Sequence, residues 1–482
     1  MIDQRPIGYV TGLLVCILGL AMLVPMVLDY RNGDPNWTAF LESSIISVVT
    51  GGLVALACRN RVGEGLSIQQ SFLLTTGLWA VLPLFGALPF MIGAPDVGLT
   101  DAYFEAMSGL TTTGATVFHE LQNLPLGTNL WRGILQWLGG LGIVIVAMVF
   151  LPVMKVGGMQ YFRSEGFDTL GKILPRALDI ATGLIRIYLG LTVLCLLAYA
   201  IVGMAPYDAV VHALTTMSTG GFSTTDSSFA KYAGPAEYVS AVFMIAASVP
   251  FVRFVQLMAG SALPMYRDLQ VRAYLRWMLY AIAAIVAYRM FHFGTDFLPA
   301  LRETTFNVVS IMSGTGYGSE DITSWGPFPF VVFLIIGIIG GCTSSTGCSI
   351  KVFRYLVLIE AIKMQIRRIY TPSRVSPMKL GNRVLEEDVV NSVIVLFTMF
   401  ILTFGITSVL LSLTGLQTGT ALTAAWTSIF NIGPAFGPEV RGSGAMDQFP
   451  VAAKWIMAGA MMLGRLELLS VFVLVLPRFW RG

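Results

Sequence analysis

Residues 111–116 read TTTGAT, and related stretches recur as STGGFST at 218–224, SGTGYGS at 313–319 and FNIGPAFG at 430–437. One glycine in each stretch serves as an anchor, and the four anchors are Gly114, Gly221, Gly316 and Gly433. Thirteen residues before each anchor stands an acidic or cap-forming residue, and six residues before it stands a hydroxyl residue. The residues thirteen positions before the anchors are Asp101, Asp208, Glu303 and Thr420, and those six positions before are Ser108, Thr215, Ser310 and Thr427. Because the anchors are unevenly spaced, 107, 95 and 117 residues apart, the shared register predicts an internal fourfold repeat.

The segment before each anchor is too short to cross a membrane. A helix that begins thirteen residues and ends about three residues before the anchor is about 16 Å long, half the thickness of a bilayer. Such a segment must enter the membrane and turn back, and its irregular backbone is tolerated only where it is buried in protein or lines a water-filled cavity. Each repeat is therefore predicted to be a helix, a pore loop and a second helix.

The composition supports a membrane location for the whole chain. The 482 residues are 55% hydrophobic and 12% charged, and the mean hydropathy is +0.74. Apolar stretches of about 20 residues recur along the chain, which predicts an all-α polytopic protein in a lipid bilayer. The net charge of +3 is small and dispersed, which argues against a nucleic-acid partner. The five cysteines lack metal-site spacing, and we interpret them as reduced and structural.

The predicted fold has two N-terminal helices followed by four helix, pore loop, helix repeats with pseudo-fourfold symmetry around one pore. The first apolar run, residues 7–28, is longer than a signal-peptide core, so we expect it to be retained as a helix. The predicted regions are an N-terminal pair at 1–66, then pore repeats one to four at 67–165, 166–265, 266–376 and 377–482.

The distribution of charges predicts the topology. Most of the 30 Lys and Arg residues fall on the side opposite the pore loops, whereas acidic residues gather near the loops. By the positive-inside rule, the pore mouth faces outward and the basic segment 351–383 is cytoplasmic. The acidic rim would raise the local cation concentration.

The loops are chemically suited to a dehydrated potassium ion. Backbone carbonyls replace its water shell without burying a fixed charge, and glycine lets successive carbonyls turn toward one axis. The sequence Thr315-Gly316-Tyr317-Gly318 is similar to known potassium filters, and the four glycine turns together are a stronger signal than this similarity.

Several motifs resemble the Trk/Ktr/HKT potassium transporter superfamily, and its TrkH-type members in particular. They are TTTGAT, GGFSTTD, SGTGYGS, NIGP, GGCTSSTGCSIK and MLGRLELL, and with the two extra N-terminal helices the resemblance covers nearly the whole chain. It implies a potassium filter built from the carbonyls of each anchor and of the two residues before it. These are Thr112, Thr113, Gly114, Thr219, Gly220, Gly221, Gly314, Thr315, Gly316, Asn431, Ile432 and Gly433. Gly114 is similar to the potassium-selective members, because a Ser in the first filter accompanies sodium preference.

The resemblance also implies partners and a location. It implies a homodimer in the bacterial inner membrane, multi-pass, with a cytosolic regulatory ring of the TrkA type that binds NAD and ATP. The basic segment 351–383 and the C-terminal residues 478–482 are candidate contacts for the ring, although ordinary positive-inside topology explains them equally well. We expect no cofactor in this chain itself, and K⁺ is the transported ion.

A polar interruption inside an apolar segment predicts a gate. The segment from Pro327 to Arg367 is too long for one span of about 20 residues. It is interrupted by Gly340, Gly341, Cys342, Thr343, Ser344, Ser345, Thr346 and Gly347. In the family the matching loop lies beneath the filter as a gate; a helix kink or a loop between two spans is the alternative.

Arg465 places a full charge in the last apolar helix, which points to function. The resemblance implies that it faces the pore below the filter, opposes cation passage and helps hold the gate loop. Glu467 lies two residues further on and is a poor partner for Arg465; Lys351 is a candidate partner for Glu467. In the second repeat, Pro250 and Arg253 stand within the apolar segment of the second helix, so the cavity wall there departs from the expected pattern.

Two other functions were weighed. A K⁺ symporter coupled to H⁺ or Na⁺ in the same scaffold remains the alternative, although the sequence offers few buried acids for coupling. An intramembrane enzyme would need a catalytic pair, a metal cluster or a phosphate-binding loop, and the sequence contains none of these patterns. We therefore expect a transport protein rather than an enzyme.

Overall fold

The computed structural model describes residues 3–59, 67–149, 158, 177–371, 377–381 and 383–481. Within these residues, seven helices are long and apolar enough to cross a membrane, or up to nine if each of two bent pairs is one span. The described strands are the two-residue pair β1 (Lys379–Leu380) and β2 (Arg383–Val384), which form a small hairpin in the basic segment. The all-α polytopic prediction is confirmed.

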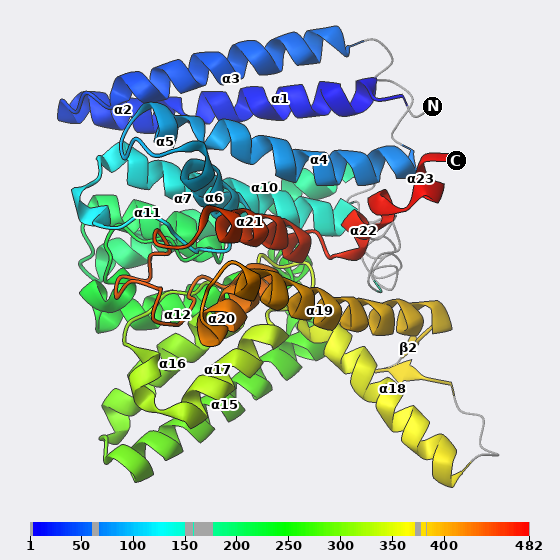
Figure 1. Cartoon of the computed structure of the whole chain (residues 1–482). Helices are drawn as coiled ribbons and strands as arrows, with labels where there is room; N and C mark the ends of the chain where they lie inside the picture. Colours follow the sequence, from blue (N-terminus) through cyan, green and yellow to red (C-terminus); the bar gives the residue numbers. More distant parts are fainter. Residues whose placement is uncertain are drawn as a thin grey trace.

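The N-terminal hairpin lies along one edge of the molecule (Figure 1). It consists of α1 (Arg5–Ala21), α2 (Leu23–Asn32) and α3 (Trp37–Ala57). Gly12 and Gly51 bring α1 and α3 into close contact, since a Cβ on either would lie 2.6 Å from the carbonyl oxygen of the other. Buried Asp29 ties the hairpin to the next helices, because it accepts hydrogen bonds from Asn36 Nδ2 at 3.0 Å and Gly127 N at 2.6 Å.

The first two repeats follow in chain order. The first contains α4 (Ile68–Gly86), α5 (Leu88–Ile92), α6 (Leu99–Leu110), the 3-10 turn η1 (Leu121–Asn123) and α7 (Leu126–Val149). The second contains α10 (Ala177–Ile201), α11 (Pro206–Met217), η2 (Ser228–Tyr232), α12 (Pro235–Ala247), α13 (Phe251–Met258) and α14 (Leu263–Arg267). A capping box between Ser67 and Gln70 starts α4.

The last two repeats complete the bundle. The third contains α15 (Leu269–Phe293), α16 (Phe297–Ser313), η3 (Ile322–Trp325), α17 (Pro327–Ile339) and α18 (Val352–Tyr370). The fourth contains α19 (Glu387–Leu413), α20 (Thr418–Phe430), α21 (Val451–Arg465), α22 (Leu469–Val475) and α23 (Pro477–Arg481). The exact repeat boundaries stay a prediction, and residues 66, 165, 166 and 376 lie outside the described residues.

The four short helices before the anchors are α6, α11, α16 and α20, and each ends three or four residues before its glycine, as predicted. Asp101, Asp208 and Thr420 lie in the first turns of their helices. Glu303 does not, because α16 begins six residues earlier, at Phe297, and places Glu303 in its second turn. The expectation that Glu303 stands at the N-terminal end of its helix was therefore wrong; it pairs with Arg289 of α15 at 2.6 Å.

The second helices of three repeats are broken, whereas the sequence indicated a clear break only in the third. Helices α12 and α13 meet at 93°, and α21 and α22 meet at 113°. The break after α12 precedes Pro250, which has no N–H to continue the helix. Helix α17 stops after 13 residues, at Ile339, so all three breaks fall at similar distances along their helices.

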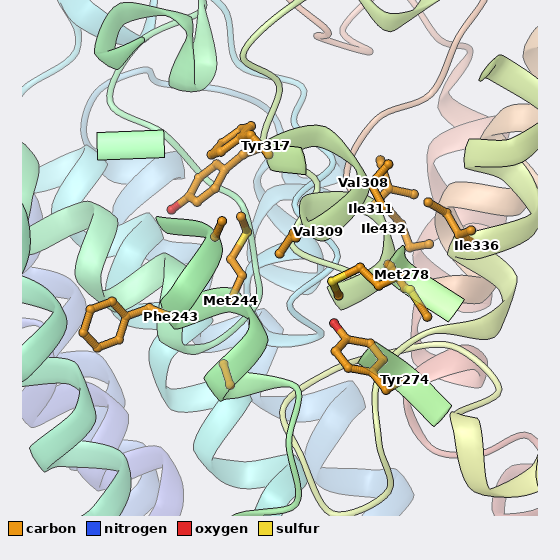
Figure 2. Close-up of a cluster of buried hydrophobic side chains, with 14 of the residues drawn as sticks. Phe243, Met244, Tyr274, Met278, Val308, Val309, Ile311, Tyr317, Ile336 and Ile432 are labelled. Atoms are coloured by element: carbon orange, nitrogen blue, oxygen red, sulfur yellow. The ribbon is translucent and has the colours of Figure 1, made fainter. Parts of the chain in front are cut away.

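Two buried apolar clusters hold the repeats together. One joins α10–α17 with residues of α20, and the other joins the N-terminal hairpin, the first repeat and α21. Figure 2 shows part of the first, where Met278 of α15 and Ile311 of α16 lie near Ile336 of α17 and Ile432, which follows α20. Burial of these side chains positions the four loops at the centre of the bundle.

Candidate ion-conduction site

The four anchor loops meet in a closed ring. A Cβ on Gly114 would lie 2.1 Å from Gly220 O, and one on Gly221 would lie 1.9 Å from Thr315 O. A Cβ on Gly316 would lie 2.7 Å from Gly433 N, and one on Gly433 would lie 3.3 Å from Gly114 O. Each loop therefore contacts the next, and the fourth returns to the first. Only a residue without a side chain fits at the first three contacts.

The backbone repeats as well as the sequence. The residues two positions before the anchors all have positive φ, namely 51° for Thr112, 53° for Thr219, 85° for Gly314 and 51° for Asn431. Three of the anchors also have positive φ, namely 83° for Gly114, 81° for Gly221 and 80° for Gly316. Alternation of this kind turns carbonyls of a short segment toward one side. Gly433 departs from the pattern, and Pro434 follows it.

The residues six positions before the anchors hold the loops. In every loop a backbone N–H donates to the carbonyl of the residue six positions before the anchor. The bonds are Thr113 N to Ser108 O at 2.9 Å, Gly220 N to Thr215 O at 2.9 Å, Gly316 N to Ser310 O at 3.2 Å and Ile432 N to Thr427 O at 3.1 Å. The hydroxyls of Ser310 and Thr427 donate to the carbonyl after their anchors, at 2.8 and 2.6 Å. The hydroxyl of Thr215 instead contacts the Tyr317 hydroxyl at 2.5 Å. The hydroxyl register thus has a structural cause in the third and fourth loops, whereas the Ser108 hydroxyl has no hydrogen-bond partner within the described residues.

The second loop is held by a side chain that the sequence analysis missed. Gln136 of α7 donates from Nε2 to Gly220 O at 2.6 Å and accepts from Phe222 N at 3.0 Å. One turn earlier, Arg132 pairs with Glu105 at 2.8 Å and donates to Ser223 O at 3.0 Å. A polar residue facing the same side as Arg132, one turn later on a membrane-spanning helix, was the available signal, but its target could not be known without the fold.

The interrupting loop lies where the broken helices meet. Residues 340–350 are all buried. The loop is bonded to the end of α12: Cys342 N donates to Ser248 O at 2.9 Å, and Thr346 N donates to Ala247 O at 3.2 Å. Phe251 N, at the start of α13, donates back to Ser344 O at 3.0 Å. The loop and the second broken helix therefore brace one another.

The same loop lies directly against the ring. Cys348 Sγ is 3.6 Å from Thr112 Oγ1, and a Cβ on Gly314 would lie 3.2 Å from Cys348 Cβ. Ser349 Oγ donates to Phe430 O, at the end of α20, at 3.1 Å. The loop thus contacts the first and third anchor segments directly and the fourth repeat at Phe430, the residue before the fourth segment. Its bonds to the second repeat are those to the end of α12 and the start of α13.

Arg465 ends α21 beside this loop. Its Nη1 donates to Thr346 O at 3.2 Å and lies 2.6 Å from Cys348 Sγ. The side chain is 5% exposed, and within the described residues its Nε and Nη2 have no hydrogen-bond partner. The sequence placed Arg465 near the loop through family resemblance, but it gave no reason to expect Cys348 as the contact.

Glu467 turns away from Arg465, as its position in the sequence indicated. It pairs with Arg354 of α18 and lies 3.7 Å from Lys351 Nζ. The expected Lys351 contact is present, and Arg354 is an additional partner. All three side chains are buried. Their ion pairs join the start of α18 to the break between α21 and α22.

The acidic residues near the outer ends of the short helices have basic partners. Asp101 pairs with Lys454 at 2.6 Å, and Asp208 pairs with Lys231 at 3.1 Å. In the loop after the fourth anchor, Arg441 pairs with Asp447 at 2.6 Å and lowers the pKa of the Asp447 carboxyl. Among the described residues no group of three or more His, Cys, Asp or Glu side chains could hold a metal ion.

The family comparison agrees with this geometry. The model of the TrkH cation transport protein family matches residues 37–291 and 296–481. The chain belongs to the TrkH family. TrkI of Halomonas elongata, a Trk system potassium uptake protein, is 38% identical over 99% of this chain and 97% of its own length. TrkH of Escherichia coli K12, also named a Trk system potassium uptake protein, is 35% identical over 99% of both chains.

A solved TrkH family member shares the fold. The crystal structure of the potassium transporter TrkH from Vibrio parahaemolyticus matches with a TM-score of 0.91 at 30% identity, covering 99% of this chain and 100% of that one. The relatives are named as transport proteins and not as enzymes, which agrees with the expectation from the sequence. The chain is a multi-pass membrane protein of this family.

Proposed function

We propose that this chain is the pore-forming subunit of a potassium uptake system and passes K⁺ through a filter of backbone carbonyls. The observation that carries the proposal is the closed ring in which each anchor glycine contacts the next loop. The proposed ligands are the twelve carbonyls of residues 112–114, 219–221, 314–316 and 431–433. The negative ends of α6, α11, α16 and α20 point toward the region below this ring, where they favour a cation.

We propose that residues 340–347 and Arg465 form a gate beneath the filter. The support is the burial of the loop, its contact with the ring at Thr112 and the position of Arg465 against Thr346 and Cys348. A guanidinium at this depth repels a cation that leaves the filter. Opening would require the loop to leave the ring and Arg465 to move with it or away from it.

Coupled symport with H⁺ or Na⁺ is the alternative, and the described buried acids give it little support. Five of these acids lie in ion pairs: Glu105 with Arg132, Asp208 with Lys231, Glu237 with Arg302, Asp268 with Arg253, and Glu467 with Arg354 and Lys351. The sixth, Asp29, accepts hydrogen bonds from Asn36 and Gly127 at the N-terminal hairpin, away from the ring. A coupling carboxylate must exchange its ion during transport, which a buried pairing with a fixed cation opposes. K⁺ is the proposed transported ion, and no cofactor in the chain is needed for this mechanism.

We propose a homodimer in the bacterial inner membrane, with α18 as the contact. This helix extends away from the rest of the chain (Figure 1). Its exposed isoleucines are spaced three, four and three residues apart, as in a helix-pairing seam: Ile359, Ile362, Ile366 and Ile369. The basic end of the same helix, with Lys363, Arg367 and Arg368, would face a cytosolic NAD- and ATP-binding ring of the TrkA type. Arg374 of the predicted basic cluster lies outside the described residues.

Rubidium and sodium uptake into liposomes tests the filter, with Gly316→Ser and Gly318→Ser as a matched pair. Gly316 has a φ of 80°, and a Cβ there would lie 2.7 Å from Gly433 N. A Cβ on Gly318 would lie 3.9 Å from its nearest neighbour, Glu320 O, so a side chain fits there. We expect wild type and Gly318→Ser to prefer rubidium, and Gly316→Ser to lose that preference. Equal preference in all three proteins would contradict the carbonyl filter, and no selective uptake by wild type would contradict the pore itself.

A further inference from the structure

The second anchor loop differs from the third and fourth in how it is held. In those two loops, the hydroxyl six residues before the anchor donates to the carbonyl just after it, from Ser310 to Tyr317 and from Thr427 to Pro434. In the second loop the matching hydroxyl, on Thr215, contacts Val211 O and the Tyr317 hydroxyl instead. The second loop therefore lacks this hydroxyl-to-carbonyl bond. The first loop also lacks it, because within the described residues the Ser108 hydroxyl has no hydrogen-bond partner.

Gln136 supplies the missing support from a neighbouring repeat. Its amide bonds the carbonyl before Gly221 and the N–H after it, so one side chain holds both flanks of the anchor. The side chain is fully buried, and both halves of the amide are satisfied by backbone groups of this loop. A Cβ on Gly220 would lie 2.3 Å from Gln136 Cδ, so the glycine before the anchor is also needed for this contact.

Helix α7 is shaped to bring Gln136 this close. A Cβ on Gly139 would lie 1.9 Å from Leu110 O, at the end of α6, and one on Gly140 would lie 2.9 Å from Ser218 Cα, after α11. These two glycines let α7 fit between the first and second loops. Arg132, on the same face, adds its bond to Ser223 O and lies 4.1 Å from the Phe222 ring. The face of α7 thus holds the loop from Gly220 to Ser223.

We propose that Gln136 is a positioning residue that sets the ion selectivity of the second filter segment. The hydrogen bond from Gln136 fixes the direction of the Gly220 carbonyl and withdraws part of the electron density of its oxygen. The Gly220 oxygen therefore binds a cation more weakly than the equivalent carbonyl oxygens of the other three segments do. The four segments are then chemically unequal. The inference rests on the proposed carbonyl filter.

The test compares the rubidium-to-sodium uptake ratio of Gln136→Met, Gln136→Glu and Thr192→Val in liposomes. Methionine fills a similar volume without either hydrogen bond, and glutamate keeps the acceptor for Phe222 N but loses the donor to Gly220 O. Thr192→Val is the matched control. Thr192 of α10 accepts a partly buried hydrogen bond at 3.1 Å from Trp137, which neighbours Gln136 on α7, and donates one to Tyr188 O at 2.7 Å; neither partner belongs to the filter. We expect the ratio to fall about tenfold in both Gln136 variants and to stay unchanged in the control.

A second measurement protects the test against poor assembly. Thermal unfolding of purified wild type should have a higher midpoint in K⁺ than in Na⁺, and the difference should shrink in Gln136→Glu but not in Thr192→Val. Lower uptake of both ions at an unchanged ratio, with the K⁺ stabilisation intact, would reduce Gln136 to a packing residue and overturn the inference. If wild type itself showed no ion preference, the proposed function would fail, which is a separate outcome.

Discussion

Arg465 Nη1 lies 2.6 Å from Cys348 Sγ, both side chains are buried, and Cys348 Sγ lies 3.6 Å from Thr112 Oγ1 of the first anchor loop. The contact joins the end of α21 to the loop that interrupts the third repeat. It places a cation next to the loop that contacts the ring, which we propose conducts cations. The charge and the loop therefore form one unit, and the charge can be tested without deleting the loop.

Replacing Arg465 with alanine should raise rubidium flux. The substitution removes the buried charge and the bond to Thr346 O, so both the electrostatic barrier and one restraint on the loop are lost. We expect about a tenfold rise in liposomes that hold the chain alone. Arg465→Lys keeps the charge and should stay within a factor of about three of wild type. A wild-type flux for Arg465→Ala at equal protein content would refute the gating role.

Much of the architecture could be predicted because its signals are local. Glycine turns after short helices, and a run of Gly, Thr and Ser inside an apolar segment, have few explanations in a membrane protein. The ends of α6, α11, α16 and α20 and the interruption after Ile339 follow from these signals. The family match over residues 37–291 and 296–481 and the shared fold of the solved TrkH agree with the predicted all-α architecture.

The remaining features depend on contacts between distant segments. Nothing near Gln136 in the sequence indicates that it reaches Gly220, 84 residues away. The break before α22 contains neither glycine nor proline, yet Glu467 and Leu468 have φ of 60° and 39°. The buried ion pairs of Glu467 with α18 favour this conformation, and they exist only in the folded chain. Such residues are found from the fold rather than from a local pattern.

Gly340→Ala should loosen the gate loop. Gly340 has a φ of 75°, and a Cβ there would lie 2.2 Å from Cys348 O, so the added methyl group must displace the loop or strain the backbone. We expect rubidium flux to rise several-fold, with the rubidium preference retained because the filter segments are unchanged. Gly405→Ala on α19 is the control, because a Cβ there meets nothing within 4 Å. Unchanged flux in Gly340→Ala would argue that these residues are a structural kink.

Glu467→Gln should destabilise the fold. The neutral side chain removes the carboxylate that faces Arg354 and Lys351, and buried cations that lose their anionic partner cost about 3 to 5 kcal/mol. Glu360→Gln removes a largely exposed pair with Lys363 on the same helix and should cost less than about 1 kcal/mol. Thermal unfolding in detergent measures both. Similar midpoints for the two variants would mean that the Glu467 pairs contribute no more than a surface contact.

Acid should weaken the start of α20 through Glu439. Its carboxylate accepts hydrogen bonds from the Thr420 hydroxyl and from Gln417 N, and these bonds lower the pKa of Glu439 below its ordinary 4.5. A lowered folded-state pKa stabilises the fold above the ordinary value, and this contribution is lost as the pH falls through the lowered value. We expect a drop in thermal stability below about pH 4.5 that is smaller in Glu439→Gln. An identical pH profile in the variant would exclude Glu439 as its source.

Alanine at Ile362, Ile366 and Ile369 should weaken the proposed homodimer. These side chains are 50%, 53% and 77% exposed on α18, and removing their apolar surface reduces the area available to a second copy. The control replaces Ile401 and Ile406 of α19, which are 68% and 60% exposed on a membrane-spanning helix. Light scattering after size exclusion in detergent should show monomers for the α18 variant and dimers for wild type and the control. A dimeric α18 variant would place the interface elsewhere, and a monomeric wild type would end the homodimer proposal. Because the filter lies within one chain, a monomeric α18 variant should keep its rubidium preference, which separates assembly from conduction.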